Sequence, residues 1–313
     1  MRPLEAGKLY GSVMLVMLMW GLNVVALKVL VAEISPVYMQ AARILLAGLS
    51  VALFVFLRKE HERVPQAAFM YILLAAVFGM TGHHTFLAIG LSETTAVKSS
   101  LILALLPITT ALLSMLFLGD AFTKLRWLGV FAGFAGAVLI NVTGEGGGAV
   151  QGAARGDAFI FAAMTAQAVS FLFIKKASEL VAPRVLTIYT LMLGSVGLFV
   201  VSFVLSPSGW ESYITAPGWV WLVFLLSGIF ATGLGQILYN ASISKIGPGK
   251  TAIFNNFVPF FGLLSSALIL GENVSPAQLG GFVFIVAGVL LGTGWVDQLL
   301  LKKRKQTSAK RHA

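Results

Sequence analysis

The stretch AVKSSLILALLPITTALLSMLFLGD, residues 96–120, decides the fold because the chain repeats it. The second copy is PGKTAIFNNFVPFFGLLSSALILGE, residues 248–272. Lys98 and Lys250 are 152 residues apart, and the central prolines of the two copies keep the same spacing. A register held across a whole apolar stretch indicates an internal duplication.

Earlier positions repeat with a slightly smaller offset. Lys28 and Lys175 are 147 residues apart, as are Pro36 and Pro183. About five residues were therefore gained between the two blocks. We predict four segments: a first repeat at 8–142, a Gly-rich linker at 143–155, a second repeat at 156–297 and a basic tail at 298–313.

Composition indicates a membrane protein. Hydrophobic residues make up 58% of the 313 residues and charged residues 11%, with a mean hydropathy of +0.91. These values lie far from those of soluble domains. The apolar runs are nearly continuous and close to bilayer length, which favours helices over the alternating strands of a barrel. We predict an all-α integral membrane protein with ten transmembrane helices in two inverted five-helix repeats.

The basic residues predict the orientation. Eighteen Lys and Arg residues lie in connections on one side, whereas Lys98 and Arg155 lie on the other. By the positive-inside rule, we expect a multi-pass protein of the cell membrane with both termini cytoplasmic. Five spans per repeat invert the second copy, an arrangement typical of secondary transporters. The net charge is +10, and all basic residues except Lys28 and Arg43 lie in loops or a juxtamembrane tail, so the partner of this charge is the lipid bilayer and not nucleic acid.

An ordered set of residues also resembles a known family, the EamA-like branch of the drug/metabolite transporter superfamily. The set comprises Trp20–Gly21, Lys28, Pro36, Arg43, 94–101, Pro107, Gly119–Asp120, Gly129, Gly133, Gly136 and Gly271–Glu272. The resemblance implies a ten-helix carrier, often an exporter of amino acids or related metabolites, with a cavity lined by the first four helices of each repeat. The second repeat departs from the first, with Thr190 at the counterpart of Arg43 and Gln167 at that of Trp20.

Arg43 is the foremost candidate for binding a substrate. It lies about two turns into the second apolar run, where a charge is costly unless it is paired or faces a wet cavity. A guanidinium binds a carboxylate through two parallel hydrogen bonds. The alternative is that Arg43 caps helix carbonyls or extends to the interface.

For each of the other polar residues within the spans, the sequence allows two interpretations, one functional and one structural. Lys98 and Lys250 either guard opposite entrances or extend to headgroups. His83 and His84 either couple transport to protons or bond one helix to another. A further set either binds a polar substrate or links helices: Trp20, Asn23, Gln167, Tyr189, Gln236, Tyr239, Asn255 and Asn256.

What the sequence lacks narrows the function. No Asp or Glu lies deep in a span, which disfavours a lipophilic-cation exporter and favours a small-molecule substrate bearing a carboxylate. No hydrolase, P-loop or zinc-protease motif is found, so we expect no enzyme, no cofactor and no metal. The alternatives are a lipid-modifying enzyme, a sensor, or a transporter of sugars, nucleotides or drugs.

The Gly129–Gly133 pair predicts close helix packing or a homodimer contact.

Overall fold

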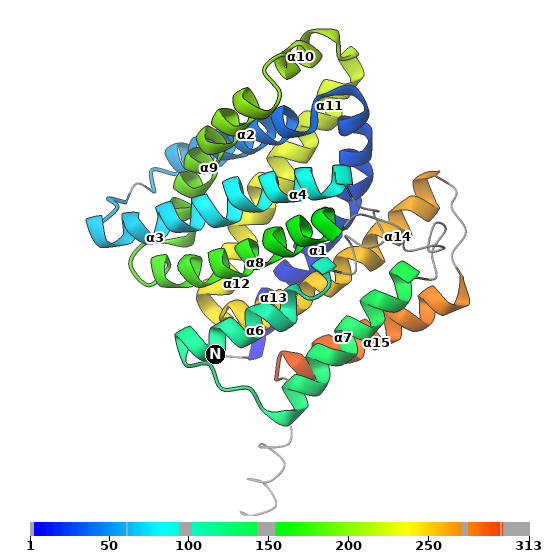
Figure 1. Cartoon of the computed structure of the whole chain (residues 1–313). Helices are drawn as coiled ribbons and strands as arrows, with labels where there is room; N and C mark the ends of the chain where they lie inside the picture. The colour runs from blue at the N-terminus through cyan, green and yellow to red at the C-terminus, as the bar shows by residue number, and fades with distance from the viewer. Residues whose placement is uncertain are drawn as a thin grey trace, which may run out of the picture.

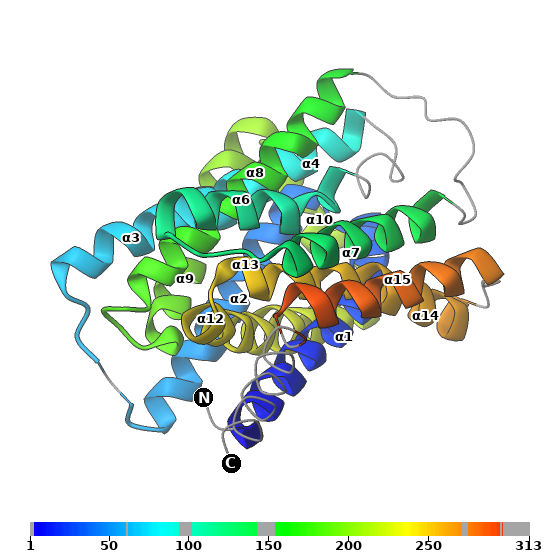
Figure 2. The ribbon, with the colours of Figure 1, turned by 90° about the horizontal axis from the view of Figure 1, so that it is seen from below.

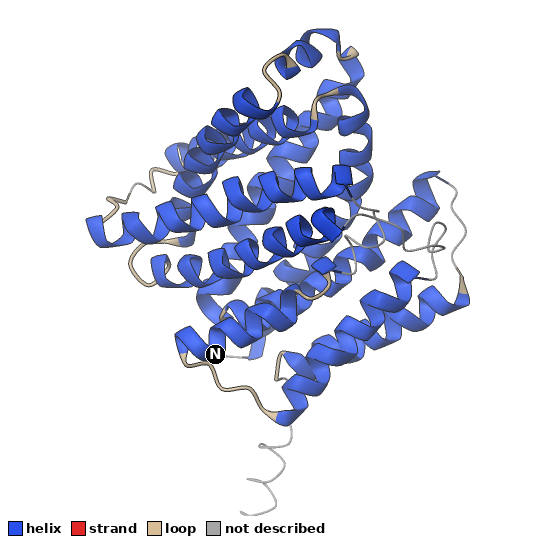
Figure 3. Cartoon of the chain, in the orientation of Figure 1, coloured by secondary structure: helices blue, strands red, loops and turns tan. Residues whose placement is uncertain are grey.

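The computed structural model of the chain describes residues 3–60, 62–93, 102–142, 154–270, 275–294 and 296. Within these ranges every regular element is a helix, and no strand occurs (Figure 3). The predicted linker lies outside the described residues except at 154 and 155, and the predicted basic tail lies wholly outside them.

The helices fall into two sets that follow one another along the chain (Figure 1). The first set is α1 (Pro3–Glu33), α2 (Pro36–Leu57), α3 (Gln66–Ala76), η1 (Val77–Gly82), α4 (His83–Glu93), α6 (Leu106–Leu118) and α7 (Lys124–Val142). The second set is α8 (Ala154–Ala177), α9 (Pro183–Leu205), η2 (Gly209–Glu211), α10 (Ser212–Thr215), α11 (Gly218–Leu226), η3 (Ser227–Leu234), α12 (Gly235–Ile246), α13 (Pro248–Ile253), η4 (Phe254–Asn256), α14 (Phe257–Leu270) and α15 (Pro276–Gly292).

Six of the described helices are long and apolar enough to cross a membrane. They are Gly7–Glu33, Pro36–Leu57, Gln66–Gly90, Ala154–Ala177, Pro183–Leu205 and Gly218–Ile246. Two shorter apolar helices, α6 and α15, have 13 and 17 residues. Large apolar side chains such as Leu116, Val204 and Leu268 are more than 70% exposed, as expected where lipid replaces water as the solvent. The chain is a multi-pass membrane protein.

Proline and glycine set the helix boundaries. Pro36 and Pro183 occupy the first turn of α2 and α9, where a missing N–H costs no helical hydrogen bond. Gly247 separates α12 from α13 with φ +86° and ψ 159°, a conformation that is essentially restricted to glycine. The chain reverses direction there within one residue.

Two of the long helices are interrupted by π-helix. The interruption η1 divides α3 from α4, and η3 divides α11 from α12. They begin at Val77 and Ser227, 150 residues apart, between the two offsets of the sequence repeat. A 3₁₀ segment, η4, likewise precedes Pro259. Such irregular turns leave backbone carbonyls and re-aimed side chains available inside the bundle.

Helices from the two sets pack against each other. α2 lies along α9, α1 along α14, and α8 along α3 and α4. α7 and α15 form a separate pair at one side of the bundle, seen in Figures 1 and 2. Their contact is made by glycines: Gly129 approaches Gly288 and Gly292, and Gly136 approaches Gly281. The small-residue faces predicted from the sequence are thus used within one chain.

Candidate functional site

Arg43 lies on α2 and is buried, with 4% of its surface exposed. Its Nη1 donates to Thr232 Oγ1 at 2.6 Å and to Ser227 Oγ at 3.4 Å, both in η3. Its Nη2 donates to Gln40 Oε1, one turn earlier on α2. The guanidinium is therefore held by three neutral oxygens from two elements. We call Arg43, Gln40, Asn23, Ser227 and Thr232 the central polar cluster.

No carboxylate in the described part of the chain lies within ion-pair distance of Arg43. The ion pairs found there include those of Arg155 with Glu93, Lys176 with Glu179 and Arg184 with Glu60. The buried Nε of Arg43 also has no hydrogen-bond partner among the described residues. A buried cation without a counter-charge is costly, and a free Nε–H is a donor available to an anion.

Asn23 connects the central polar cluster to an open groove. Ser227 Oγ donates to Asn23 Oδ1 at 2.5 Å, and both residues line this groove of about 330 Å³ between α1 and the α11–η3 helix. The other lining residues are apolar: Met19, Leu22, Ala26, Val223, Leu226, Phe230 and Ala231. The cluster thus lies next to an apolar groove that opens at the surface of the bundle, where Leu22, Leu226 and Phe230 are about half exposed.

Trp20 forms an aromatic wall beside the cluster. Its Nε1 donates to the carbonyl of Ala231 in η3 at 2.9 Å. Its ring lies 4.9 Å from that of Tyr239, which in turn lies 5.2 Å from Phe171. The π-helical turn therefore supplies acceptors to both Arg43 and Trp20, and it joins the charge to the aromatic surface.

Asn255 and Asn256, near Tyr239, each have a side-chain polar atom without a hydrogen-bond partner among the described residues. Asn255 Nδ2 donates to the Tyr239 hydroxyl at 2.8 Å. Asn255 Oδ1 and the buried Asn256 Nδ2 have no partner among the described residues. Asn256 packs against Gly133 of α7, where a larger residue would collide with its amide. Asn255 is the better placed of the two to contact a substrate, because its free atom is a carbonyl oxygen beside an aromatic wall.

Gln236 belongs to a closed network. Its Nε2 donates to Asn240 Oδ1 at 3.1 Å, and Asn240 Nδ2 donates to Thr187 Oγ1 at 2.9 Å. Thr187 then donates to the carbonyl of Pro183 on its own helix. This chain links α12 to α9 and satisfies its buried members, which favours the helix-linking reading for Gln236.

The two histidines have different surroundings. His83 Nδ1 lies 2.9 Å from the carbonyl oxygen of Ala163 on α8. The ring of His84 lies 4.9 Å from that of His83, and its buried Nδ1 has no partner in the described chain. His83 thus links α4 to α8, whereas His84 keeps a buried ring nitrogen without a partner among the described residues.

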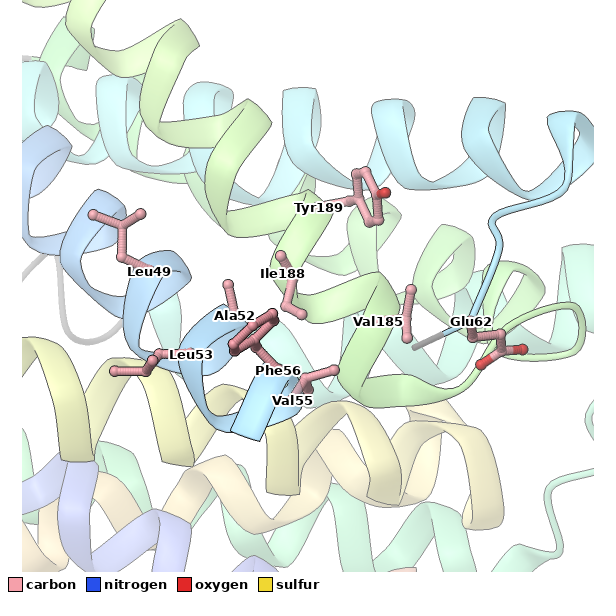
Figure 4. Close-up of a pocket in the computed structure, with 9 residues that line it drawn as sticks. All are labelled: Leu49, Ala52, Leu53, Val55, Phe56, Glu62, Val185, Ile188 and Tyr189. Carbon is pink, nitrogen blue, oxygen red and sulfur yellow. The ribbon is translucent and has the colours of Figure 1, made fainter. Parts of the chain in front are cut away.

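The remaining predicted residues lie away from the central polar cluster. Tyr189 is 39% exposed and lines a different cavity, about 500 Å³ between α2 and α9, with Glu62 at its rim (Figure 4). Gln167 lies near Gly79 of η1. Lys98 lies outside the described residues.

Lys250 is half-buried near the start of α13, close enough to Asp120 for their charges to interact. Burial raises the pKa of the Asp120 carboxyl, and the positive charges of Lys250, Lys175 and Arg126 oppose that rise. Lys175 donates from Nζ to the carbonyl of Ser244 at 2.8 Å and so caps the end of α12.

Several members of the site escaped the sequence analysis, namely Gln40, Ser227, Thr232 and Thr187. The sequence gives no signal for Ser227 and Thr232, because they lie 184 and 189 residues from Arg43 in a long apolar run. Among the described residues, no three His, Asp or Glu side chains gather to hold a metal ion.

The sequence model of the EamA-like transporter family matches the chain twice, over residues 8–142 and 154–293. The chain belongs to this family. This EamA-like transporter is 30% identical over 275 residues to the uncharacterized transporter YyaM of Bacillus subtilis, covering 85% of this chain and 87% of the relative. It is 28% identical over 287 residues to the uncharacterized transporter sll0355 of Synechocystis, covering 87% and 86%.

A plant protein and a solved structure extend these likenesses. The EamA-like transporter is 24% identical to the WAT1-related protein At3g02690, chloroplastic, of Arabidopsis thaliana, covering 87% of this chain and 66% of the relative. A crystal structure of a protein superimposes with a TM-score of 0.80 at 17% identity, covering 94% of this chain and 99% of the other. That likeness supports the fold alone.

Proposed function

We propose that this transporter exports small metabolites that bear a carboxylate, amino acids among them, with Arg43 as the anchor. The observation that carries the proposal is the buried guanidinium held only by neutral oxygens. An incoming carboxylate finds a free Nε–H and a charge that no described carboxylate neutralises. The partly exposed ring of Trp20 offers an apolar surface for the remainder of the substrate.

The transport cycle that we propose is alternating access between two inverted five-helix repeats in the cell membrane, with both termini cytoplasmic. Three features support it. The sequence register repeats at offsets of 147 and 152, the π-helices η1 and η3 fall at matching places in it, and the family model matches the chain twice. Inverted repeats with broken helices at their interface are typical of secondary transporters.

Uptake into proteoliposomes tests the anchor. A panel of radiolabelled amino acids and their decarboxylated analogues would be compared for wild type, Arg43→Ala and Arg43→Lys. We expect Arg43→Ala to lower transport of carboxylates roughly 10- to 100-fold, because a hydrogen bond to a charged group contributes about 1.5–3 kcal/mol. Arg43→Lys should recover only part of the lost transport, since lysine keeps the positive charge but lacks the two parallel N–H donors of a guanidinium.

Arg58→Ala is the matched control, because Arg58 is the residue that ends the same helix and its guanidinium lies over the Phe54 ring, away from the central polar cluster. It should transport as wild type does. Thermal unfolding in detergent would establish that every variant is folded. Equal transport of a carboxylate and its decarboxylated analogue by wild type would contradict the proposed substrate class.

A further inference from the structure

Two hydrogen bonds place side chains of one half of the chain on matching backbone groups of the other half. Ser212 Oγ accepts from the backbone N–H of Ser35 at 3.0 Å, and Glu62 Oε2 accepts from that of Ala182 at 3.0 Å. Ser35 and Ala182 are 147 residues apart. Each is the N-cap residue before the proline that begins α2 or α9.

These contacts lie at opposite ends of the bundle. Ala182 immediately precedes α9, whereas Ser212 lies in α10 shortly after α9 ends. The 23 residues of α9 span about 34 Å at 1.5 Å per residue. Figure 1 shows α10 at the top and the connection between α8 and α9 at the lower left.

A second contact reinforces each bond. Next to Glu62, Arg184 Nε lies 3.0 Å from Glu60 Oε2. Next to Ser212, the Tyr213 hydroxyl donates to the carbonyl of Tyr38. We call Glu60, Glu62, Ala182 and Arg184 the Glu62 latch, and Ser35, Tyr38, Ser212 and Tyr213 the Ser212 latch. Each latch joins the first half of the chain to the second.

The latches differ in chemistry. The Glu62 latch is ionic and solvated, with the side chains of Arg184 and Glu60 39% and 41% exposed, and such surface pairs are weak and screened by salt. The Ser212 latch is neutral, and burial raises the pKa of Tyr213, with Tyr38 adding to that rise. Tyr213 therefore remains a hydrogen-bond donor at physiological pH. Both kinds of contact can be exchanged for water.

We propose that Glu62 and Ser212 are the two gate residues of the transport cycle, each holding the two halves of the chain together at one end of the bundle. The inference rests on the proposed alternating access, in which the two ends open in turn. With both latches formed, Arg43 is 4% exposed, as expected for a site closed at both ends. By the predicted orientation, Glu62 closes the cytoplasmic end and Ser212 the outer end.

The chain contains no cysteine, so a single introduced thiol reports on access. Ser227→Cys places a thiol in the central polar cluster, where Ser227 is 3% exposed. A membrane-impermeant maleimide would be added to sealed right-side-out and inside-out vesicles. We expect Glu62→Ala to raise labelling from the cytoplasmic face several-fold and to lower it from the outer face. Ser212→Ala should do the reverse.

Matched controls lie in the same connections. Glu179→Ala removes an exposed carboxylate paired with Lys176 beside the Glu62 latch, and Ser208→Ala removes an exposed hydroxyl beside the Ser212 latch. Neither should change the labelling. Glu62→Gln keeps an acceptor oxygen and should retain the closed state better than Glu62→Ala. A difference between these two variants would show that the lost hydrogen bond, and not misfolding, changes the labelling.

The labelling experiment needs no substrate. Its result therefore tests the gates separately from the transport assay, which tests the substrate class. Reciprocal labelling without transport of the amino-acid panel would support the gates and overturn only the substrate class. Transport by wild type, combined with labelling that Glu62→Ala and Ser212→Ala leave unchanged or raise from both faces, would overturn the gates and leave the carrier in place.

Discussion

At the residue scale, the Thr232 hydroxyl has two roles. It accepts a hydrogen bond from Arg43 Nη1 at 2.6 Å and donates to the carbonyl of Ser227 at 3.2 Å. It therefore fixes the position of the guanidinium relative to the π-helical turn. Loss of this oxygen would remove the shorter of the two hydrogen bonds that Arg43 Nη1 donates.

We expect Thr232→Val to lower the free energy of unfolding by about 2 kcal/mol, because a hydrogen bond to a charged group contributes roughly 1.5–3 kcal/mol. Thr232→Ser keeps the hydroxyl and should remain close to wild type. Thermal unfolding of the purified protein in detergent would measure both. Equal stability of the valine and serine variants would show that the contact contributes nothing.

The contrast between His83 and His84 gives a prediction about protons. Nδ1 of His83 lies at hydrogen-bond distance from the Ala163 carbonyl, whereas that of His84 has no partner among the described residues. We expect His84→Gln to abolish the response of transport to an imposed pH gradient, while His83→Gln keeps it. Flux into proteoliposomes, with and without the gradient, checks this. An unchanged response in His84→Gln would exclude it as the coupling group.

Arg43 could be singled out from the sequence because a charge in an apolar run has few explanations. Its partners could not, since Ser227 and Thr232 are 184 and 189 residues away and are common in membrane helices. The outward placement of Tyr189 also depends on which face of α9 packs against α2, and an almost wholly apolar helix gives no periodic signal of its inner face.

At the element scale, glycine spacing determines how α7 and α15 meet. A Cβ on Gly288 would lie 2.6 Å from the Cα of Gly133, whereas one on Gly280 would meet only Leu139, at 3.9 Å. We expect Gly288→Ala to destabilise the protein by about 1–3 kcal/mol through overpacking. Gly280→Ala should be neutral. Thermal unfolding of the Gly288→Ala and Gly280→Ala variants would measure the difference. Equal stability of the two variants would contradict tight packing at Gly288.

The sequence predicts that the third apolar run of each repeat is a helix, but not that each contains a π-helical turn. Length and hydropathy determine the helix, because a backbone in lipid must satisfy its own hydrogen bonds. The turn depends on neighbours: Trp20 and Arg43 bind oxygens that η3 presents. Glycines such as Gly228 and Gly233 make room for α2 there, yet glycine alone does not predict a π-helix.

At the scale of the whole molecule, inversion predicts opposite exposure of equivalent positions. α2 ends at Leu57 and α9 ends at Leu205, so Arg58 and Ser208 follow the second helix of each repeat. We expect an impermeant maleimide to label Arg58→Cys only from the cytoplasmic side and Ser208→Cys only from the outside. Labelling of both from one side would contradict the inverted layout.

The burial of Arg43 without a described counter-charge also has an electrical consequence. In the proposed cycle the empty site carries a positive charge, whereas a site loaded with a monoanion is close to neutral. A unit charge that crosses the full membrane field changes energy by about 2.3 kcal/mol per 100 mV. For a monoanionic substrate, the inside-negative voltage would therefore draw the empty site toward the cytoplasm, where an exporter collects its cargo, and each turnover would be electrogenic; a zwitterionic amino acid would leave the loaded site charged.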